Sequence, residues 1–592
     1  MKGRRDRGRR GSLVVGRPGV APLVVSVVAA ALVIGPGLAP GYLLVRDMVF
    51  VPSPPLTGRL LGLGHETPRA VPSDLVVALL SHALPGDLVQ KLVLLALLVA
   101  AGTGAARLAP RGAGPGAAAA LVAIWNPYVG ERLAMGQWAL LVGYAALPWV
   151  VAGVGRLARG DRSRVGSLVA ALVAGSLGGG LAWVTLGLAT LATLGATSLA
   201  GRDGRGVLAR SWWVLALGAA LALPWGVPAL LRPQGPTSDP AGFSVFAPHS
   251  DTPFGVVLSL LTGGGSWNGE VVPAGRDTLP GAVGALLLLG WAAFGFLSSR
   301  RSPAASGDES AGGDRLAVLA SGAVGLVIAL LSAVPSLLAP LADVPGGGLL
   351  RDGSRQLGPW VLALAVGASW GVAGLRELRV PRGALVVATL LPVAVLPSLG
   401  WGLAGLLRPV ALPPAVAAVR SALDVEAAPG SVVVLPFQAY RRYPWNADLT
   451  SLTPWPRALD RRVVVSSDLV VATPGGERTV AGEDPYAVRV RAALADADPA
   501  RALAAAGVGW LVVDVPGTAV PTGTTRVLTA AGASLYRVDA PVSGPAVAAQ
   551  DDPPAVPVLV GDGITLALAV LASGWAARRN RRSRGMTQPP TI

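Results

Sequence analysis

Long apolar runs are the feature that most limits what this chain can fold into. Most of these runs are roughly 17–25 residues long with almost no charged side chain, which is the length needed to cross the ~30 Å hydrocarbon core of a bilayer. Hydrophobic residues make up 52% of the 592 residues and charged residues only 14%. So few charges cannot cover a soluble protein of this size. The sequence therefore predicts a polytopic α-helical membrane protein with about 12 spans.

The first of these runs predicts a span that is not cleaved. Basic side chains are frequent over residues 1–18, and an apolar run follows at about 21–44. A signal peptide has the same order, but its apolar core is only roughly 7–15 residues long and ends at a small-residue cleavage site. Neither feature fits this run, so we expect a basic cytoplasmic tail followed by a permanent first span.

Arginine clusters give the orientation of the remaining spans. These are expected at about 88–106, 115–128, 138–155, 166–180, 182–200, 211–231, 281–298, 316–339, 358–375, 384–406 and 556–577. Arginines gather at the end of every second run, beginning with Arg107 and Arg111. Because cytoplasmic loops collect Lys and Arg, we expect a protein of the cytoplasmic membrane with both termini in the cytoplasm. The long first loop, 45–87, then lies outside.

Residues 409–553 differ in character from the rest of the chain. Charges of both signs return, and the apolar runs shorten to strand length in Ser431–Pro436 and Trp510–Val515. An Ala-rich segment, Pro499–Ala506, is typical of a helix and ends at a glycine. This order predicts an extracytoplasmic α/β domain near the C-terminus. The predicted division of the chain is a cytoplasmic tail 1–18, a membrane domain 19–408, an α/β domain 409–553, a final span 554–577 and a cytoplasmic basic tail 578–592.

The net charge of +16 follows from this topology and does not indicate a nucleic-acid partner. The basic residues lie at the ends of apolar runs and form no single face or arm. Most of them are Arg, which together with abundant Ala, Val and Gly is typical of a GC-rich bacterium such as an actinomycete. Cysteine is absent, which excludes disulfides, thiolate metal sites and a cysteine nucleophile.

Asp47 is the first candidate for a catalytic residue. The spans hold almost no ionisable side chain, which disfavours an ion-coupled carrier, so the polar groups of interest lie in the outer loops. Asp47 follows the first span directly, where membrane meets water. A carboxylate there can act as a general base on an acceptor hydroxyl or help to hold a divalent metal. The alternative is that Arg46-Asp47 only marks the membrane interface.

Two further outer segments are candidates for substrate binding. Glu131, Arg132 and Gln137 lie in a polar turn beside the unusually short run 115–128, and interrupted helices are found where a cavity needs polar groups. Arg351, Asp352 and Arg355 lie between two later spans, where the arginines can bind an anionic phosphate. The polar residues of the loop 232–280, taken one by one, are expected to be solvated.

Three segments carry a resemblance to a known class. GYLLVRDMVFVP (Gly41–Pro52), NPYVGERLAMGQWALLVGYAALPW (Asn126–Trp149) and LLRDGSRQLGPW (Leu349–Trp360) are similar to segments of uncharacterised actinobacterial membrane proteins related to that class. Together with the many spans, the long first outer loop with an acid after span one, and the C-terminal α/β domain, they make the chain resemble the GT-C class of membrane glycosyltransferases. These enzymes use polyprenyl-phosphate sugars as donors.

The resemblance implies an enzyme that moves a sugar from a polyprenyl-phosphate donor to an envelope glycan or glycolipid on the outer face. Asp47 would take the place of the catalytic carboxylate, and Arg351 or Arg355 would bind the donor phosphate. The chain departs from the class in having no Asp-x-Asp or paired acid at Asp47, which leaves a divalent metal open. Two alternatives remain: a non-enzymatic scaffold for envelope assembly, and a translocator of lipid-linked sugars. Membrane lipids are partners in every case.

Overall fold

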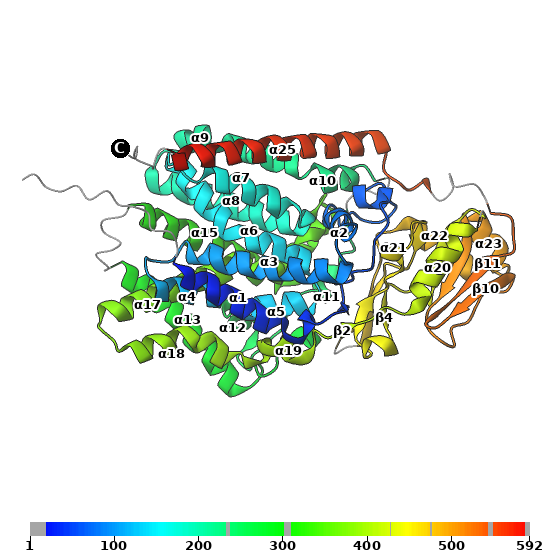
Figure 1. Cartoon of the computed structure of the whole chain (residues 1–592), viewed down its shortest axis with the longest axis horizontal. Coiled ribbons are helices and arrows are strands. Elements are labelled where there is room, and N and C mark those ends of the chain that lie inside the picture. The colour runs from blue at the N-terminus through cyan, green and yellow to red at the C-terminus, as the bar shows by residue number, and fades with distance from the viewer. Residues whose placement is uncertain are drawn as a thin grey trace, which may run out of the picture.

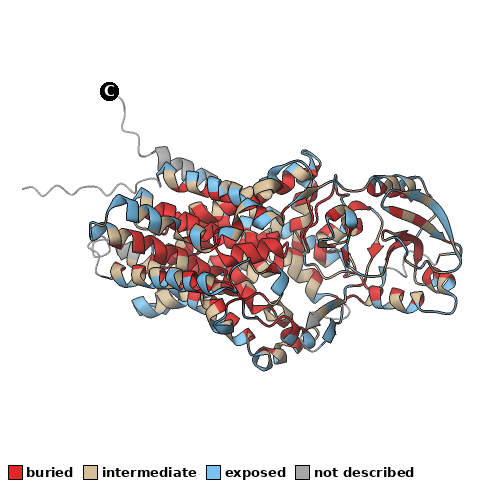
Figure 2. Ribbon diagram, turned by 90° about the horizontal axis from the view of Figure 1, so that it is seen from below, coloured by how far each residue is buried: buried red, intermediate tan, exposed pale blue. Residues whose placement is uncertain are grey.

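The computed structural model describes residues 19–232, 237–300, 309–426, 428–473, 476–542 and 549–585. The predicted tail 1–18 lies outside the described residues, as do the last residues, 586–592, of the predicted tail 578–592. A bundle of helices forms one end of the molecule, and an α/β domain forms the other end (Figure 1). Buried residues run through the middle of the bundle, and its outside is more exposed (Figure 2).

Eight helices of the described chain are long and apolar enough to cross a membrane. They are α1 (Val20–Ile34) with its extension η1 (Gly35–Leu38), α3 (Gly86–Ala106), α6 (Trp138–Ala158), α8 (Gly179–Gly201), α13 (Leu279–Ser299), α15 (Glu309–Ser332), α17 (Gly358–Glu377) with the preceding η6 (Gly353–Leu357), and α25 (Ala555–Gly585). Two bent pairs pass the same test: α9 (Gly204–Leu221) with α10 (Leu223–Leu230), and α18 (Arg382–Val395) with η7 (Pro397–Leu399) and α19 (Gly400–Gly405). The protein is therefore a multi-pass membrane protein with 8 to 10 candidate spans.

The prediction of about 12 spans was too high, because two of the predicted runs form short helices. The runs 115–128 and 166–180 correspond to α4 (Ala113–Ile124) and α7 (Val165–Ser176), with 12 residues each. At 1.5 Å per residue such a helix is only about 18 Å long. α4 ends because Asn126 caps the next helix, α5 (Pro127–Ala134), whose first residue is a proline that disfavours helical geometry in the residue before it. α4 still packs inside the bundle, against α1, α3 and α17.

The α/β domain is built on a five-stranded sheet with the order β10-β11-β9-β3-β6. The strands are β3 (Ser431–Leu435), β6 (Val463–Val464), β9 (Val508–Val513), β10 (Thr524–Ala530) and β11 (Ala533–Val538). β3 runs parallel to β6 and β9, whereas β11 runs antiparallel to β9 and β10. The two strands predicted from sequence are confirmed as β3 and β9. The α/β character of this region is therefore confirmed.

Helices cover both faces of this sheet. Val432 and Val434 of β3 pack into one apolar core with α20 (Pro414–Val425). Val433 and Leu435 pack into a second core with α22 (Pro485–Leu494) and α23 (Pro499–Ala505), the predicted Ala-rich helix. Alternate side chains of a strand point to opposite faces, so a continuous apolar run such as SVVVL indicates a strand that is covered on both sides.

Residues 42–51 lie between the core of the bundle and a core of the α/β domain. Their first strand, β1 (Tyr42–Leu43), pairs antiparallel with β2 (Pro409–Val410), which follows the α18–α19 pair. Side chains that pack in the core of the bundle are Leu43, Val45, Met48 and Phe50. Side chains that pack in the core of the α/β domain are Leu44, Val49 and Val51. We call residues 42–51 the shared strand, because it belongs to both domains.

Replacing Leu44 with alanine should loosen the junction between the two domains. Leu44 is 1% exposed, and removal of a buried Leu side chain costs about 2–5 kcal/mol. Leu56→Ala is the matched control, because Leu56 lies in the same loop and is 56% exposed. We expect Leu44→Ala alone to lower the melting temperature and to speed hydrogen–deuterium exchange in β3. Equal melting temperatures and equal exchange rates in the two variants would contradict the packing of Leu44 in the core of the α/β domain.

Candidate functional site

The turn that carries Asp47 is fixed to the C-terminal end of α5. The backbone N–H of Asp47 donates to the carbonyl oxygen of Met135 over 3.1 Å. The guanidinium of Arg46 donates to the carbonyl oxygen of Ala134 at 3.0 Å and to the carboxylate of Glu270 at 2.9 Å. Asp47 is therefore held by backbone contacts with a helix, although it lies in a loop. This geometry argues against a residue that only marks the membrane interface.

Gly136 allows this close approach. Its φ of +74° is in the left-handed region, which favours glycine. A Cβ atom at this position would lie 2.2 Å from the backbone nitrogen of Met48 and 2.3 Å from the carbonyl oxygen of Val45. These are backbone atoms of the turn itself and cannot move aside as a flexible side chain would. Only glycine therefore fits between α5 and the Asp47 turn.

The α/β domain reaches Asp47 through Tyr440. This residue lies in the small hairpin of β4 (Tyr440–Arg442) and β5 (Thr450–Leu452), and its hydroxyl donates a hydrogen bond to Oδ1 of Asp47. Burial and the nearby Asp47 carboxylate raise the pKa of Tyr440 well above its usual value, so the hydroxyl keeps its proton. Oδ2 of Asp47 accepts no hydrogen bond from the described residues. One oxygen of the candidate base is thus bound by protein and the other is available.

Three arginines from two segments lie around the pair of Asp47 and Tyr440. Arg69 of the first loop and Arg351 of the segment before α17 both bind the carboxylate of Glu483, at 3.1 and 3.2 Å. The charge of Arg69 acts on Asp47, and the charges of Arg69 and Arg355 act on Tyr440. The predicted donor-phosphate residues Arg351 and Arg355 are therefore brought to the same place as Asp47. Arg69 was not singled out in the sequence, where it is one arginine in a Pro-rich loop.

The local field in this cluster favours an anion. Burial and, next to it, the positive charge of Arg69 lower the pKa of Arg351 to about 10. Burial alone would raise the pKa of Glu483, but Arg69 and Arg351 hold it below its usual value. Glu483 is thus the anion that now neutralises the two arginines. A phosphate group, which offers more acceptor oxygens to guanidinium groups, has the matching chemistry.

Arg132, Gln137 and Asp352 form a buried network behind the arginines. Arg132 is fully buried and donates to Oε1 of Gln137 at 2.8 Å and to Oγ of Ser354 at 3.2 Å. Asp352 accepts a hydrogen bond of 2.6 Å from Ser354 and lies 3.0 Å from Arg355. These contacts tie α5 to the segment that carries Arg351 and Arg355. The network therefore positions the site, and Arg132, Gln137 and Asp352 are too deeply buried to face an open substrate space.

Glu131 belongs to a second buried cluster, on the other side of α5. Arg276 binds both oxygens of the Asp251 carboxylate, at 2.7 and 3.0 Å, and Glu131 makes a side-chain hydrogen bond with Asp251. Burial and the charge of Asp251 raise the pKa of Glu131 to about 8. Burial would also raise the pKa of Asp251, but Arg276 holds it below its usual value. Glu131 is therefore protonated at neutral pH.

The expectation that polar residues of the loop 232–280 are solvated was wrong for Asp251, which is 3% exposed. Arg276, which was not singled out in the sequence, is equally buried. The signal that could have identified them is the Gly263-Gly264-Gly265 run between them. A Cβ atom on Gly264 would lie 2.1 Å from Oδ2 of Asp251 and 3.0 Å from Oε1 of Glu131. The glycines make room for buried carboxylates, which an analysis of hydrophobic periodicity predicts to be solvent-exposed.

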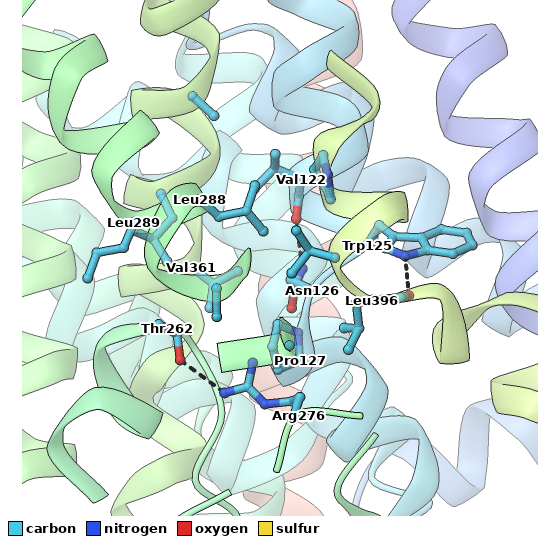
Figure 3. A pocket seen from close by; sticks show the side chains of 16 residues that line it. Val122, Trp125, Asn126, Pro127, Thr262, Arg276, Leu288, Leu289, Val361 and Leu396 are labelled. Atoms are coloured by element: carbon cyan, nitrogen blue, oxygen red, sulfur yellow. Dashed lines mark hydrogen bonds between the residues drawn. The ribbon is translucent and has the colours of Figure 1, made fainter. Parts of the chain in front are cut away.

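An apolar slot opens next to Arg276, between α4, α13, α17 and α18 (Figure 3). Its free volume is about 40 Å³, so it is narrow. Aliphatic side chains such as Val122, Leu288 and Leu289 line most of it, and Arg276 with Thr262 lies at one end. A narrow apolar slot that ends at polar groups has the chemistry to hold part of a lipid chain.

The residues around Asp47 do not fit a divalent metal. Within the described ranges, no three His, Asp or Glu side chains come together in a way that could hold a metal ion. The groups next to Asp47 are a tyrosine hydroxyl and arginines, whose positive charges oppose a cation. No metal is therefore given a role in the chemistry below.

Comparison with known proteins identifies a shared fold. No family model matches the sequence, and no curated protein matches it. Cryo-EM structures of the arabinofuranosyltransferase AftD from Mycobacteria do match. One has a TM-score of 0.53 at 15% identity, and a mutant form of the same enzyme has a TM-score of 0.57 at 18% identity.

These matches cover 88% of this chain but only 40% and 41% of the AftD chains, so the chain spans about two fifths of the enzyme it resembles. The structural similarity to AftD, a GT-C membrane glycosyltransferase, confirms the predicted resemblance at the level of the fold. Identities this low establish the fold alone. The function therefore has to be argued from the site.

Replacing Gly136 with alanine should displace the Asp47 turn. The matched control is Gly275→Ala, because Gly275 also has a positive φ, of +91°, but its Cβ position is open. Both variants bear the roughly 1–2 kcal/mol cost of a left-handed alanine, and only Gly136→Ala adds the clash with the turn. We expect a clearly lower melting temperature and faster hydrogen exchange at residues 45–48 in Gly136→Ala. Equal melting temperatures would refute the close-approach argument.

The pKa of Glu131 predicts how the stability of the protein depends on pH. The folded state keeps Glu131 protonated up to about pH 8, whereas the unfolded chain releases this proton near 4.5. The unfolded state therefore gains relative stability as the pH rises from about 4.5 to 8. We expect the melting temperature of purified Glu131→Gln to fall less than that of the wild type as the pH rises from about 4.5 to 8. Glu477→Gln, at an exposed position, should retain the wild-type slope.

Proposed function

We propose that this chain is a membrane glycosyltransferase that moves a sugar from a polyprenyl-phosphate donor to a cell-envelope glycan or glycolipid on the outer face. The observation that carries the proposal is the convergence of Asp47, Tyr440, Arg69, Arg351 and Arg355 at the junction of the two domains. In this proposal the membrane domain comprises 19–408 and 554–577, both termini are cytoplasmic, and the α/β domain 409–553 lies outside.

Asp47 acts as the general base. Its free Oδ2 accepts the proton of the acceptor hydroxyl while Oδ1 keeps the hydrogen bond from Tyr440. The acceptor oxygen forms its bond to the anomeric carbon as the bond between that carbon and the phosphate oxygen breaks. The polyprenyl phosphate leaves with the bonding electron pair. A direct displacement needs only this one base, whereas a covalent glycosyl-enzyme needs a second carboxylate as nucleophile.

Arg351, Arg355 and Arg69 bind the donor phosphate and stabilise its charge as it leaves. Glu483 occupies two of these arginines in the present structure, so donor binding exchanges one anion for another. The exchange keeps the local charge balanced. The buried network of Arg132, Gln137 and Asp352 acts indirectly, by keeping the Arg351 segment against α5.

The donor class is argued from the apolar slot and from the fold. A slot lined by aliphatic side chains between spanning helices supports a lipid-linked donor over a soluble nucleotide sugar. The similarity to AftD supports a pentofuranose, and specifically arabinofuranose, as the sugar to be tested first. The acceptor then approaches from the aqueous side, where Tyr440 of the α/β domain meets Asp47.

Replacing Asp47 with asparagine should lower sugar transfer by at least ~100-fold, the usual contribution of a general base. The assay uses the full-length protein in proteoliposomes with a polyprenyl-phosphate arabinofuranose donor and a radiolabelled oligosaccharide of arabinofuranose as the acceptor. Asp424→Asn is the matched control, because Asp424 is an exposed carboxylate of the same domain as Tyr440. Full transfer by Asp47→Asn would end the base assignment. No transfer by the wild type, with a need for 409–553 in envelope assembly, would favour the scaffold.

A further inference from the structure

A cavity separate from the Asp47 cluster lies between the first loop and the α/β domain. Its free volume is about 210 Å³. One wall comes from residues 57–66, around η2 (Gly58–Leu61), and the other from residues 456–463, between α21 (Trp455–Ala458) and β6. These two segments are almost 400 positions apart in the sequence, so only the docked arrangement of the domains creates the cavity.

The walls combine fixed arginines with polar groups that have spare hydrogen-bonding capacity. Arg461 donates to three backbone carbonyl groups, and Arg462 binds the carboxylate of Asp552. Both guanidinium groups are therefore already bound within the α/β domain. Asp460, in contrast, is exposed and has no ion pair among the described residues, and Glu66 has only a loose ion pair of 3.8 Å with Arg59.

This mixture of charges fits a neutral polyhydroxyl ligand. The carboxylates of Glu66 and Asp460 would repel an anion, and Arg59 with the fixed arginines would repel a cation. Sugar hydroxyl groups both donate and accept hydrogen bonds, so they can bind free carboxylates and a guanidinium at the same time. Leu63, Leu459 and other apolar residues of the lining can pack against the C–H faces of a sugar ring. A cavity below the roughly 300–1,000 Å³ of drug-sized sites suits one or two sugar units.

The cavity shares a wall with the candidate active site. Asp484 binds the imidazole of His65, a residue of the cavity lining, at 2.8 Å. The residue before it, Glu483, binds Arg69 and Arg351 of the Asp47 cluster. Adjacent Cα atoms lie about 3.8 Å apart, so only a thin partition separates the two spaces. The two spaces are therefore linked through two consecutive residues, Glu483 and Asp484.

We propose that this cavity is a subsite for the acceptor glycan, which binds sugar units away from the reacting end. The assignment rests on the proposed function for the identity of the reacting end, but the cavity itself is independent of Asp47. Glu66 and Asp460 accept hydrogen bonds from sugar hydroxyl groups, and Arg59 donates to a ring or hydroxyl oxygen. The subsite selects acceptors that are long enough to reach it.

The test measures binding of arabinofuranose oligosaccharides to the full-length protein in nanodiscs by calorimetry. We expect Glu66→Gln and Asp460→Asn each to weaken binding of a hexasaccharide about tenfold, as for a lost hydrogen bond to a charged group. Asp424→Asn is the control for charge, and melting temperatures check the fold of every variant.

Three outcomes would overturn the assignment. These are unchanged hexasaccharide binding in both variants, no oligosaccharide binding by the wild type, and tighter binding in the variants, which would show that the two carboxylates do not accept hydrogen bonds from the sugar. Asp47→Asn separates this proposal from the proposed function, because it should abolish transfer but leave hexasaccharide binding intact. If Asp47→Asn still transfers sugar, Asp47 is not the general base. The result of the oligosaccharide-binding test is not affected by that outcome.

Discussion

The packing of the shared strand between two cores is the constraint on which the rest of the structure depends. Leu43 and Leu44 are neighbours in the sequence but belong to the cores of different domains. A shift of the strand by one residue would exchange the two sets of side chains, so its register is strongly fixed. The backbone of Arg46 adds to this by bonding Thr450 and Leu452 of the α/β domain. The position of Asp47 is thus set by the docking of the domains and not by its own loop.

Buried charges around α5 serve the same arrangement. Removing such groups from water is costly, and a buried ion pair is weak evidence for stability by itself. Here neighbouring residues of one helix face different segments: Glu131 contacts the segment of Asp251, and Arg132 contacts that of Asp352. Each pair forms only when its own segment is correctly placed. These buried polar contacts therefore specify which segments lie next to α5, and so bring Arg351 towards Asp47.

Sequence patterns predicted what depends on local composition. Long apolar runs identified the membrane bundle, and the SVVVL run identified β3 as a strand covered on both faces. They overcounted the spans, because a proline after Asn126 limits α4 to half the thickness of a bilayer, which no hydropathy window detects. Asp47 was found because it follows the first span directly, and Arg351 because it lies in a loop between two predicted spans. Tyr440 and Arg69 were not, since their role comes from contacts across almost the whole chain, which leave no periodic signal.

A site assembled in this way has a physical advantage for a reaction between a lipid and a water-soluble chain. Asp47 comes from the first loop, Arg351 from the entry to α17 and Tyr440 from the α/β domain. These three segments meet only where the end of the bundle contacts the α/β domain (Figure 1). Hydrocarbon lies on one side of that junction and water on the other. In the proposed function, a donor held by its lipid and an acceptor held by its glycan would therefore meet there without either one leaving its own solvent.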